Sequence, residues 1–463
     1  MDTVNETGER PRRDGGTKSP AAALRARLLR GSGWVLLAKV FSSILGLVVN
    51  MLLTRLLTHD QVGAYFLVFS LAIFGAQLAV VGMDRAVVRM VSAGIGTAQP
   101  GQARSAVKHA FTFGAIGSLV VAAVMVVGLG GFLAQHVYHS TLVSGSVVFA
   151  AAWLMAMAMN TLVAETFRGF QRFWLASVFG GLAVDFLSAV VFGLVWLSHA
   201  RPTLAHIVLL AVGVTCMSLT IGGILLGRRV SRLGREGHLP AREMLSIGWP
   251  LLVTNILTFM VGTGVDIWIL AAYVPASEVA LYGAASKLVF FVATPFIIAS
   301  QVVPPIISEL YASGRKHELE KSLREVAMLA GIPAALALIA FLIFGATIMG
   351  FVYTPFYRQG ATVLAILSVA RLYAVATGNS GALLMMTGHQ KTMMRITAIS
   401  AVYAVTTELL LAPRFGLVGV AIGTATAQFL QNTLQLVFGK LRVGIWTHAE
   451  LSLRPVLELI GRK

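Results

Sequence analysis

Apolar stretches of about twenty residues recur about twelve times between Gly33 and Lys440, with short polar segments between them. A helix of about twenty apolar residues crosses the hydrocarbon core of a bilayer. Such a helix also satisfies its own backbone N–H and C=O groups, as lipid requires. The pattern predicts an all-α polytopic membrane protein with about twelve transmembrane helices. We expect spans at residues 33–54, 62–83, 109–131, 144–166, 174–197, 205–227, 248–272, 279–305, 326–352, 361–386, 393–412 and 416–439.

Composition agrees with this class, since 57% of the residues are hydrophobic and 12% are charged. The net charge of +17 is unevenly distributed along the chain. With the N-terminus inside, 29 of the 36 Lys and Arg residues fall in cytoplasmic segments, and four fall in outer loops. This asymmetry follows the positive-inside rule. We therefore expect both termini to be cytoplasmic, and we interpret the basic charge as a topology signal and not as a nucleic-acid surface.

Short matches between the first and second parts of the chain indicate an internal repeat. They lie in the same order at sequence offsets of 215 to 219 residues. The matching pairs are residues 33–37 with 248–252, 61–65 with 278–282, and 160–172 with 379–391. Each repeat would hold six spans, an even number, so both would enter the membrane from the same side. The sequence thus predicts two parallel six-helix repeats around a central cavity, an arrangement that alternating-access transporters use.

The repeat sets the expected domain organisation. Two six-helix halves are joined by a basic cytoplasmic linker and flanked by cytoplasmic ends. The segments are residues 1–32 (basic N-terminal segment), 33–227 (first half), 228–247 (linker), 248–440 (second half) and 441–463 (C-terminal segment).

Four segments resemble a known family. They are LLTRLL at 52–57, GAY at 63–65, GMDRAVVR at 82–89 and ETFRGFQR at 165–172. The chain is similar in them to the bacterial polysaccharide-transporter proteins. These are the Wzx-like oligosaccharide flippases of the multidrug/oligosaccharidyl-lipid/polysaccharide exporter superfamily. The resemblance implies that an undecaprenyl-pyrophosphate-linked oligosaccharide is moved from the inner to the outer leaflet of a bacterial cytoplasmic membrane.

Three cations fall inside predicted spans: Lys39, Lys287 and Arg371. A charge at membrane depth costs about 2.5–3.5 kcal/mol on insertion scales, so such residues usually face a cavity or a partner. Lys39 lies near the inner end of its span, where its stem can instead extend to the surface. Arg371 lies close to mid-bilayer and reaches neither surface easily. Because Arg and Lys pair well with phosphate, the three residues are candidate ligands of a pyrophosphate group.

Carboxylates also occur inside the spans. Asp185 and Asp266 lie deep in the fifth and seventh spans, and Glu408 is expected near an outer end, at the interface. Two roles remain open for the two aspartates. They either form ion pairs with the buried cations or bind a proton or sodium ion during transport, as intramembrane carboxylates often do.

Polar residues near the inner surface are further candidates. Asn160 and Asn379 form one of the repeated pairs, and each is either a sugar contact or a hydrogen bond between helices. Arg168, Arg172 and Lys391 flank the predicted cytoplasmic mouth. They are either phosphate-attracting residues or ordinary topology determinants.

Sequence motifs of several enzyme classes are absent. The chain has no G-x-x-x-x-G-K-[ST] phosphate loop and no H-E-x-x-H or paired-cysteine metal motif. We expect neither a cofactor nor catalysis. The leading prediction is a flippase for O-antigen, capsule or exopolysaccharide biosynthesis that works beside polysaccharide polymerase machinery. A cation-coupled multidrug or small-molecule exporter and a non-transporting membrane scaffold are the alternatives.

Overall fold

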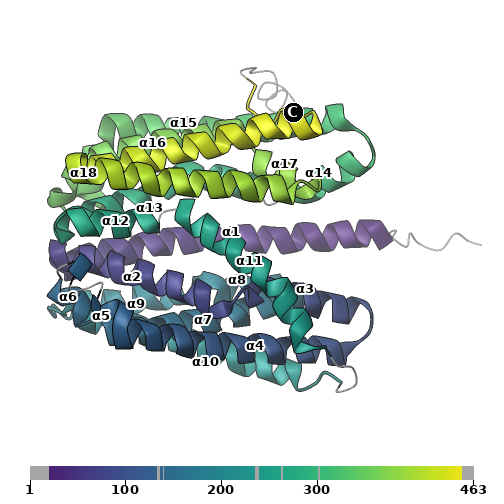
Figure 1. Cartoon of the computed structure of the whole chain (residues 1–463), viewed down its shortest axis with the longest axis horizontal. Helices are drawn as coiled ribbons and strands as arrows, with labels where there is room; N and C mark the ends of the chain where they lie inside the picture. The colour runs from purple at the N-terminus through teal and green to yellow at the C-terminus, as the bar shows by residue number, and fades with distance from the viewer. Residues whose placement is uncertain are drawn as a thin grey trace, which may run out of the picture.

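The computed structural model describes residues 20–132, 136–138, 140–234, 239–261, 264–300 and 303–450. In these residues the regular secondary structure is entirely helical. The helices run roughly parallel to the long axis of the molecule (Figure 1). Most of residues 1–32 and of residues 441–463 lie outside the described residues or have no described side chain, so the role expected for these two ends stays a prediction.

One group of helices comprises α1 to α10 and is called the N-terminal bundle. Its long helices pack mainly on one another, with α7 against α10, α2, α3 and α4. Its elements are α1 Pro20–Leu56, α2 His59–Val80, α3 Met83–Gly96, α4 Pro100–Val124, the π-helical turn Met125–Leu129, α5 Gly130–Phe132, α6 Thr141–Ser144, α7 Val147–Gly169, α8 Phe173–Ser177, the π-helical turn Val178–Leu182, α9 Ala183–Leu197 and α10 Leu204–Val230.

The second group, α11 to α18, is called the C-terminal bundle. In it α15, α16 and α18 pack side by side, and α13 packs on α15 and α16. Figure 1 shows it above the N-terminal bundle. Its elements are α11 Ala241–Val261, α12 Val265–Tyr273, α13 Ala276–Ser300, α14 Val303–Ala312, α15 Lys316–Val352, the 3₁₀ turn Pro355–Gly360, α16 Ala361–Thr377, α17 Ser380–Met386 and α18 Gln390–Val443.

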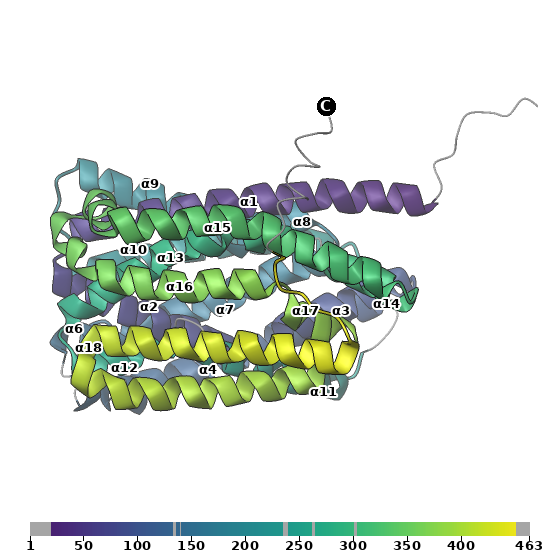
Figure 2. The same cartoon turned by 90° about the horizontal axis from the view of Figure 1, so that it is seen from above.

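Eleven helices in the described residues are long and apolar enough to cross a membrane. One of them, α18, has 54 residues, which would extend about 80 Å at 1.5 Å per residue. The chain reverses at Gly416, where φ is +54°, and Figure 2 shows α18 as two antiparallel arms. These two arms match the predicted eleventh and twelfth spans. The prediction of an all-α polytopic membrane protein is confirmed. Large apolar side chains such as Leu119 and Leu336 are exposed on the outside of the protein, where lipid would contact them.

Three predicted spans are less regular than expected. The seventh begins earlier, at Ala241, and is divided between α11 and α12, with Gly264 just before α12. The eighth ends at Ser300 in α13, and α14 continues the chain from Val303. The tenth ends at Thr377, because Gly378 has φ of +72° and cannot continue a helix. A single continuous helix was the wrong prediction for the tenth span, which the structure divides between α16 and α17.

The two bundles contact each other along α2. At one end of α2, a Cβ on Gly63 would overlap the carbonyl oxygen of Ala276 at the start of α13. At its other end, a Cβ on Gly82 would overlap the carbonyl oxygen of Gly248 in α11. These glycines let the backbones of the two bundles approach closely, as small residues do between membrane helices. Glycine at position 82 also provides the φ of +71° that separates α2 from α3.

A basic end of the molecule can be defined from the helix ends. We use this term for the end at which α3, α14 and α17 lie, which is on the right in Figure 1. Arg172 and Arg315 lie in turns between helices, and Lys391 lies in the first turn of α18. At this end α11 leans obliquely from the C-terminal bundle onto α3 (Figure 1).

Candidate functional site

A cluster of charges joins the two bundles. Asp185 on α9 accepts a hydrogen bond from the Ser42 hydroxyl on α1. Its charge interacts with those of Lys39 on α1 and Lys287 on α13. One carboxylate thus lies within electrostatic range of a cation from each bundle. We call Lys39, Asp185 and Lys287 the interbundle cluster.

The two lysines of this cluster lie over aromatic rings of the opposite bundle. The Lys39 Nζ is 5.8 Å from the ring centroid of Phe290 on α13. The Lys287 Nζ is 5.2 Å from the ring centroid of Phe69 on α2. Contacts of this kind contribute about 0.5–2 kcal/mol, depending on how far the cation is removed from water. Each bundle therefore contributes one lysine that contacts an aromatic ring of the other bundle.

Both ammonium groups retain unused hydrogen-bonding capacity. Lys39 is exposed, and Lys287 is partly exposed. Within the described part of the chain, neither ammonium makes a hydrogen bond or an ion pair within 4 Å. An ammonium has three donors, and the single Asp185 charge does not balance two lysines. The cluster thus has an excess positive charge that an anionic ligand can neutralise.

A second polar cluster lies wholly within the C-terminal bundle. Asp266 on α12 and Glu408 on α18 are both buried, at 1% and 3% exposure. The Tyr282 hydroxyl donates to Asp266 Oδ2 at 2.6 Å, and the Thr424 hydroxyl donates to Glu408 Oε1 at 3.0 Å. The two hydroxyl oxygens are 3.1 Å apart. We call these four residues the acidic chain, because polar contacts run from one carboxyl through the two hydroxyls to the other. Each hydroxyl has one proton, so the contact between the two hydroxyls becomes a hydrogen bond when one carboxyl is protonated and donates to its own hydroxyl.

Glu408, expected near the outer end of its span, is buried where the two arms of α18 face each other. The reversal at Gly416 brings Thr424 back beside Glu408, and Gly423 leaves room for its side chain, because a Cβ there would lie 2.7 Å from Glu408 Cγ. Sequence analysis also missed Tyr282 and Thr424. The only signal was a carboxylate and a threonine placed at similar depth in two consecutive spans.

Arg371 on α16 lies near the acidic chain. Its charge interacts with Asp266 and Tyr282, and its side chain is partly exposed. In the described residues its guanidinium forms no ion pair within 4 Å and no hydrogen bond. Arg371 is thus close enough to respond to the charge of Asp266, while its donors stay free for another ligand.

The two repeated asparagines have different surroundings. Asn160 is buried, its Nδ2 donates to the Phe179 carbonyl at 2.8 Å, and its Oδ1 accepts from Ser218 at 3.1 Å. This side chain connects α7 to the turn after α8 and to α10. Asn379 is also buried, but its Nδ2 has no hydrogen-bond partner in the described residues.

The three basic residues predicted at the mouth are not brought together. Arg168 forms an ion pair with Glu165 at 2.8 Å. Arg172 lies one turn later in the chain, beside a pocket described below. Lys391 is exposed on the C-terminal bundle. The structure therefore offers no single basic ring composed of these three side chains.

Two of the four family-like segments, 82–89 and 165–172, lie at the basic end. Asp84, from the segment 82–89, accepts a hydrogen bond from Asn255 of α11 at 3.4 Å. Ser92 donates to the carbonyl of Gly169, in the segment 165–172, at 3.1 Å. These residues join α3 to α7 within one bundle and to α11 of the other. The polar side chains of Asp84 and Ser92 are therefore explained by hydrogen bonds that hold α3 to its neighbouring helices.

Known proteins share this fold. A multidrug resistance MATE family transporter of the MOP superfamily, in its inward-facing conformation, is 14% identical and superimposes with a TM-score of 0.68, covering 87% of this chain and 94% of the other. The lipid II flippase MurJ, in an inward closed conformation, is 16% identical with a TM-score of 0.62, covering 88% and 87%. An uncharacterised membrane protein of Methanocaldococcus jannaschii is 20% identical over 433 residues, 89% of this chain and 84% of its own.

The family itself is shown by the sequence. The model of a family described as polysaccharide biosynthesis protein matches residues 28–311, more than half of the chain. The match includes all four segments on which the resemblance rests, and the fold is that of MOP superfamily transporters. The chain is a multi-pass membrane protein that belongs to the polysaccharide biosynthesis protein family.

Proposed function

We propose that the protein is a flippase that moves a polyprenyl-pyrophosphate-linked oligosaccharide across the membrane. The interbundle cluster is the observation that carries this proposal. It holds two lysines with free donors and one carboxylate at the boundary where two moving halves would separate. Family membership supports a polysaccharide cargo, and the fold supports transport between two bundles.

The cations match the chemistry of this cargo. A pyrophosphate carries at least two negative charges, which are costly to move through lipid without partners. Lys39 and Lys287 would bind its oxygens from opposite bundles, and Arg371 would supply a planar pair of donors. The polyprenyl tail would stay in the bilayer while the glycan crosses between residues 33–227 and 248–440. Asn379, with its unpaired amide, is the better candidate of the two asparagines for a sugar contact, whereas Asn160 is assigned to helix packing.

The acidic chain would couple transport to a cation, either a proton or sodium. Two buried carboxyls connected through two hydroxyls can hold one positive charge between them, because burying two carboxylates without compensation is very costly. Arg371 would be attracted to Asp266 when both carboxyls of the acidic chain are ionised. When the acidic chain has bound a proton or sodium ion, Arg371 would be free to bind the pyrophosphate instead. Asp185 would instead stay near the two lysines and offset part of their positive charge.

The orientation proposed from sequence places the basic end in the cytoplasm of a bacterium, with both termini there. Arg168 and Lys391 would then act as topology determinants in accordance with the positive-inside rule. The glycan would be delivered to polymerase machinery on the outer side.

The test is a deletion strain of the native host, complemented with variants. Lipid-linked glycans are extracted and analysed by mass spectrometry, and their leaflet is assigned by accessibility in intact cells and in inverted vesicles. We expect a complete glycan to accumulate on the inner leaflet in the deletion strain. Wild-type protein should clear it, and Lys287→Met should not, although it is present in the membrane.

Each other outcome identifies an alternative. An unchanged lipid-linked pool combined with new sensitivity to cationic drugs would contradict the proposal and favour a small-molecule exporter. Full complementation by variants at Lys39, Lys287 and Arg371 together would favour a scaffold that moves nothing. The exposed Lys321→Met on α15 is the matched control, because it removes one lysine outside the interbundle cluster.

A further inference from the structure

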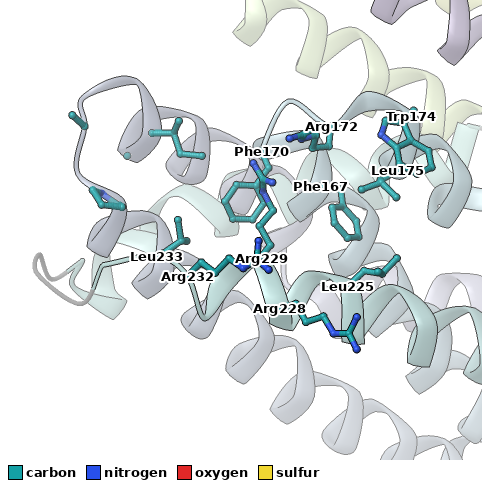
Figure 3. Close-up of a pocket in the computed structure, with 14 residues that line it drawn as sticks. Phe167, Phe170, Arg172, Trp174, Leu175, Leu225, Arg228, Arg229, Arg232 and Leu233 are labelled. Carbon is teal, nitrogen blue, oxygen red and sulfur yellow. The ribbon is translucent and has the colours of Figure 1, made fainter.

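A pocket of about 850 Å³ opens at the basic end of the N-terminal bundle. Figure 3 shows its lining side chains, which come from the α3–α4 turn, the end of α7, α8 and the end of α10. All of these residues lie between positions 94 and 233. The pocket is therefore separate from the interbundle cluster, to which α13 of the C-terminal bundle contributes.

Four arginines lie around this pocket: Arg172, Arg228, Arg229 and Arg232. Among the described residues that line it none is acidic, and in this part of the chain none of the four arginines forms an ion pair within 4 Å. The charges acting on Arg229 are those of Arg172 and Arg232, both of the same sign. Like charges gathered in one cavity repel one another, and a bound anion removes that cost.

Arg229 has an unused donor. Its guanidinium lies 5.1 Å from the ring centroid of Phe170, which fixes its orientation toward the pocket (Figure 3). Its Nε is buried and has no hydrogen-bond partner in the described residues. A buried N–H without a partner costs about 1–3 kcal/mol. A phosphate oxygen would satisfy this donor and the charge at once.

The apolar part of the lining lies on the membrane side of the arginines. Leu225 precedes Arg228 by about one turn of α10, and Phe167 and Leu175 belong to the ends of two other spans. Leu225 and Trp174 are 39% and 53% exposed, although both are large apolar side chains. The surface thus changes from apolar to cationic toward the basic end. A phospholipid has the same order, with acyl chains followed by a phosphate.

We propose that this pocket binds an anionic phospholipid of the surrounding leaflet, with its phosphate on Arg172, Arg229 and Arg232 and one acyl chain along Leu225 and Phe167. A lipid seated there would connect the α3–α4 turn, the α7–α8 turn and the end of α10. The proposal does not depend on the transported cargo. It assigns a structural lipid to the N-terminal bundle.

The test uses the purified full-length protein and dioleoyl phosphatidylglycerol as the probe. Native mass spectrometry counts bound lipid during a titration, and thermal unfolding reports stabilisation. The variant is R172Q/R229Q/R232Q. The matched control, K321Q/R395Q/R442Q, removes three exposed charges from the C-terminal bundle. We expect one saturable site whose affinity falls at least ten-fold in the pocket variant, and by less than two-fold in the control.

A second variant separates binding from folding. Leu225→Trp narrows the apolar part of the pocket and keeps all four arginines, and it should weaken phosphatidylglycerol binding at least five-fold. Phosphatidylcholine and inorganic phosphate are measured in parallel, and both should bind at least ten-fold more weakly than phosphatidylglycerol. Equal losses in the pocket and control variants, or no loss in Leu225→Trp, would overturn the proposal. Inorganic phosphate binding as tightly as the lipid would overturn it in favour of a free-phosphate site.

Discussion

The interbundle cluster and the acidic chain both place charges inside membrane helices, yet they are built in opposite ways. The interbundle cluster has two lysines and one carboxylate, is partly exposed, and takes its residues from both bundles. The acidic chain has two buried carboxyls connected by hydroxyls, and all its residues belong to the C-terminal bundle. Helix α13 contributes Lys287 to the first and Tyr282 to the second.

This difference is consistent with the two roles proposed above, cargo binding by the interbundle cluster and cation coupling by the acidic chain. A site that must receive and release a large anion benefits from free donors that separate when the bundles separate. A site that binds a proton or a small cation benefits from burial and from a fixed hydrogen-bond chain, which stay intact when one bundle moves as a unit. Tyr282 and Lys287 are five positions apart on α13, about 7.5 Å along the helix. Movement of α13 would therefore displace both sites.

Removal of a lysine from the interbundle cluster should have the largest effect. Lys287→Met leaves one phosphate charge without its partner, at a cost of about 2.5–3.5 kcal/mol. Since each 1.4 kcal/mol is a factor of ten, transport of lipid-linked glycan should fall by roughly 100-fold or more. The measurement is glycan accumulation on the inner leaflet of the complemented deletion strain. Transport within three-fold of wild type would remove Lys287 from the cargo site.

Neutralising the acidic chain should affect coupling more than cargo binding. In the double variant Asp266→Asn, Glu408→Gln, transport driven by an ion gradient should fall about ten-fold, while exchange without a gradient should remain. The measurement is transport in proteoliposomes with and without imposed proton and sodium gradients. A gradient response equal to that of wild type would contradict the role of the acidic chain. The response that is lost identifies the coupling ion.

Contact between the bundles can be changed without touching either cluster. Gly63→Ala places a Cβ against the Ala276 carbonyl, and overpacking of this kind costs about 1–3 kcal/mol. We expect a lower melting temperature in detergent and a weaker α2–α13 contact. Gly46→Ala on α1 is the control, because a Cβ there meets nothing within 4 Å. Equal melting temperatures for the two variants would show that the space between α2 and α13 at Gly63 can accommodate a Cβ.

The smallest expected effect is at Asn160. Asn160→Ala removes two hydrogen bonds within the N-terminal bundle, and such bonds between membrane helices average about 0.6 kcal/mol each. Stability should fall by about 1 kcal/mol, with transport within three-fold of wild type. Asn379→Ala, which removes an unpaired amide, should instead reduce transport more than stability. The reverse pattern would assign the sugar contact to Asn160.

Local sequence features predicted the fold and part of the site. Span length and the distribution of Lys and Arg predicted the helices, and the cost of buried charge singled out Lys39, Lys287 and Asp185. Hydropathy did not predict the helix break at Gly378, because one glycine changes mean hydropathy little while its φ of +72° ends the helix.

The acidic chain was less predictable. Its hydrogen bonds depend on the relative register of α12, α13 and the two arms of α18, which follows from packing and the reversal at Gly416. Nothing within the span that contains Glu408 shows that Thr424 lies opposite. Likewise, the crossed lysine–aromatic contacts require α2 and α13 to be placed side by side before they can be recognised.

In the proposed mechanism, lysines from both bundles hold the anionic head of a lipid-linked glycan during transport. The most direct measurement follows the leaflet of that glycan, purified from the deletion strain, in proteoliposomes containing wild-type protein or the Lys39→Met, Lys287→Met variant. We expect the wild-type protein to move the glycan to the opposite leaflet, and the variant to lose at least about 99% of that movement. Equal movement by both proteins would contradict it.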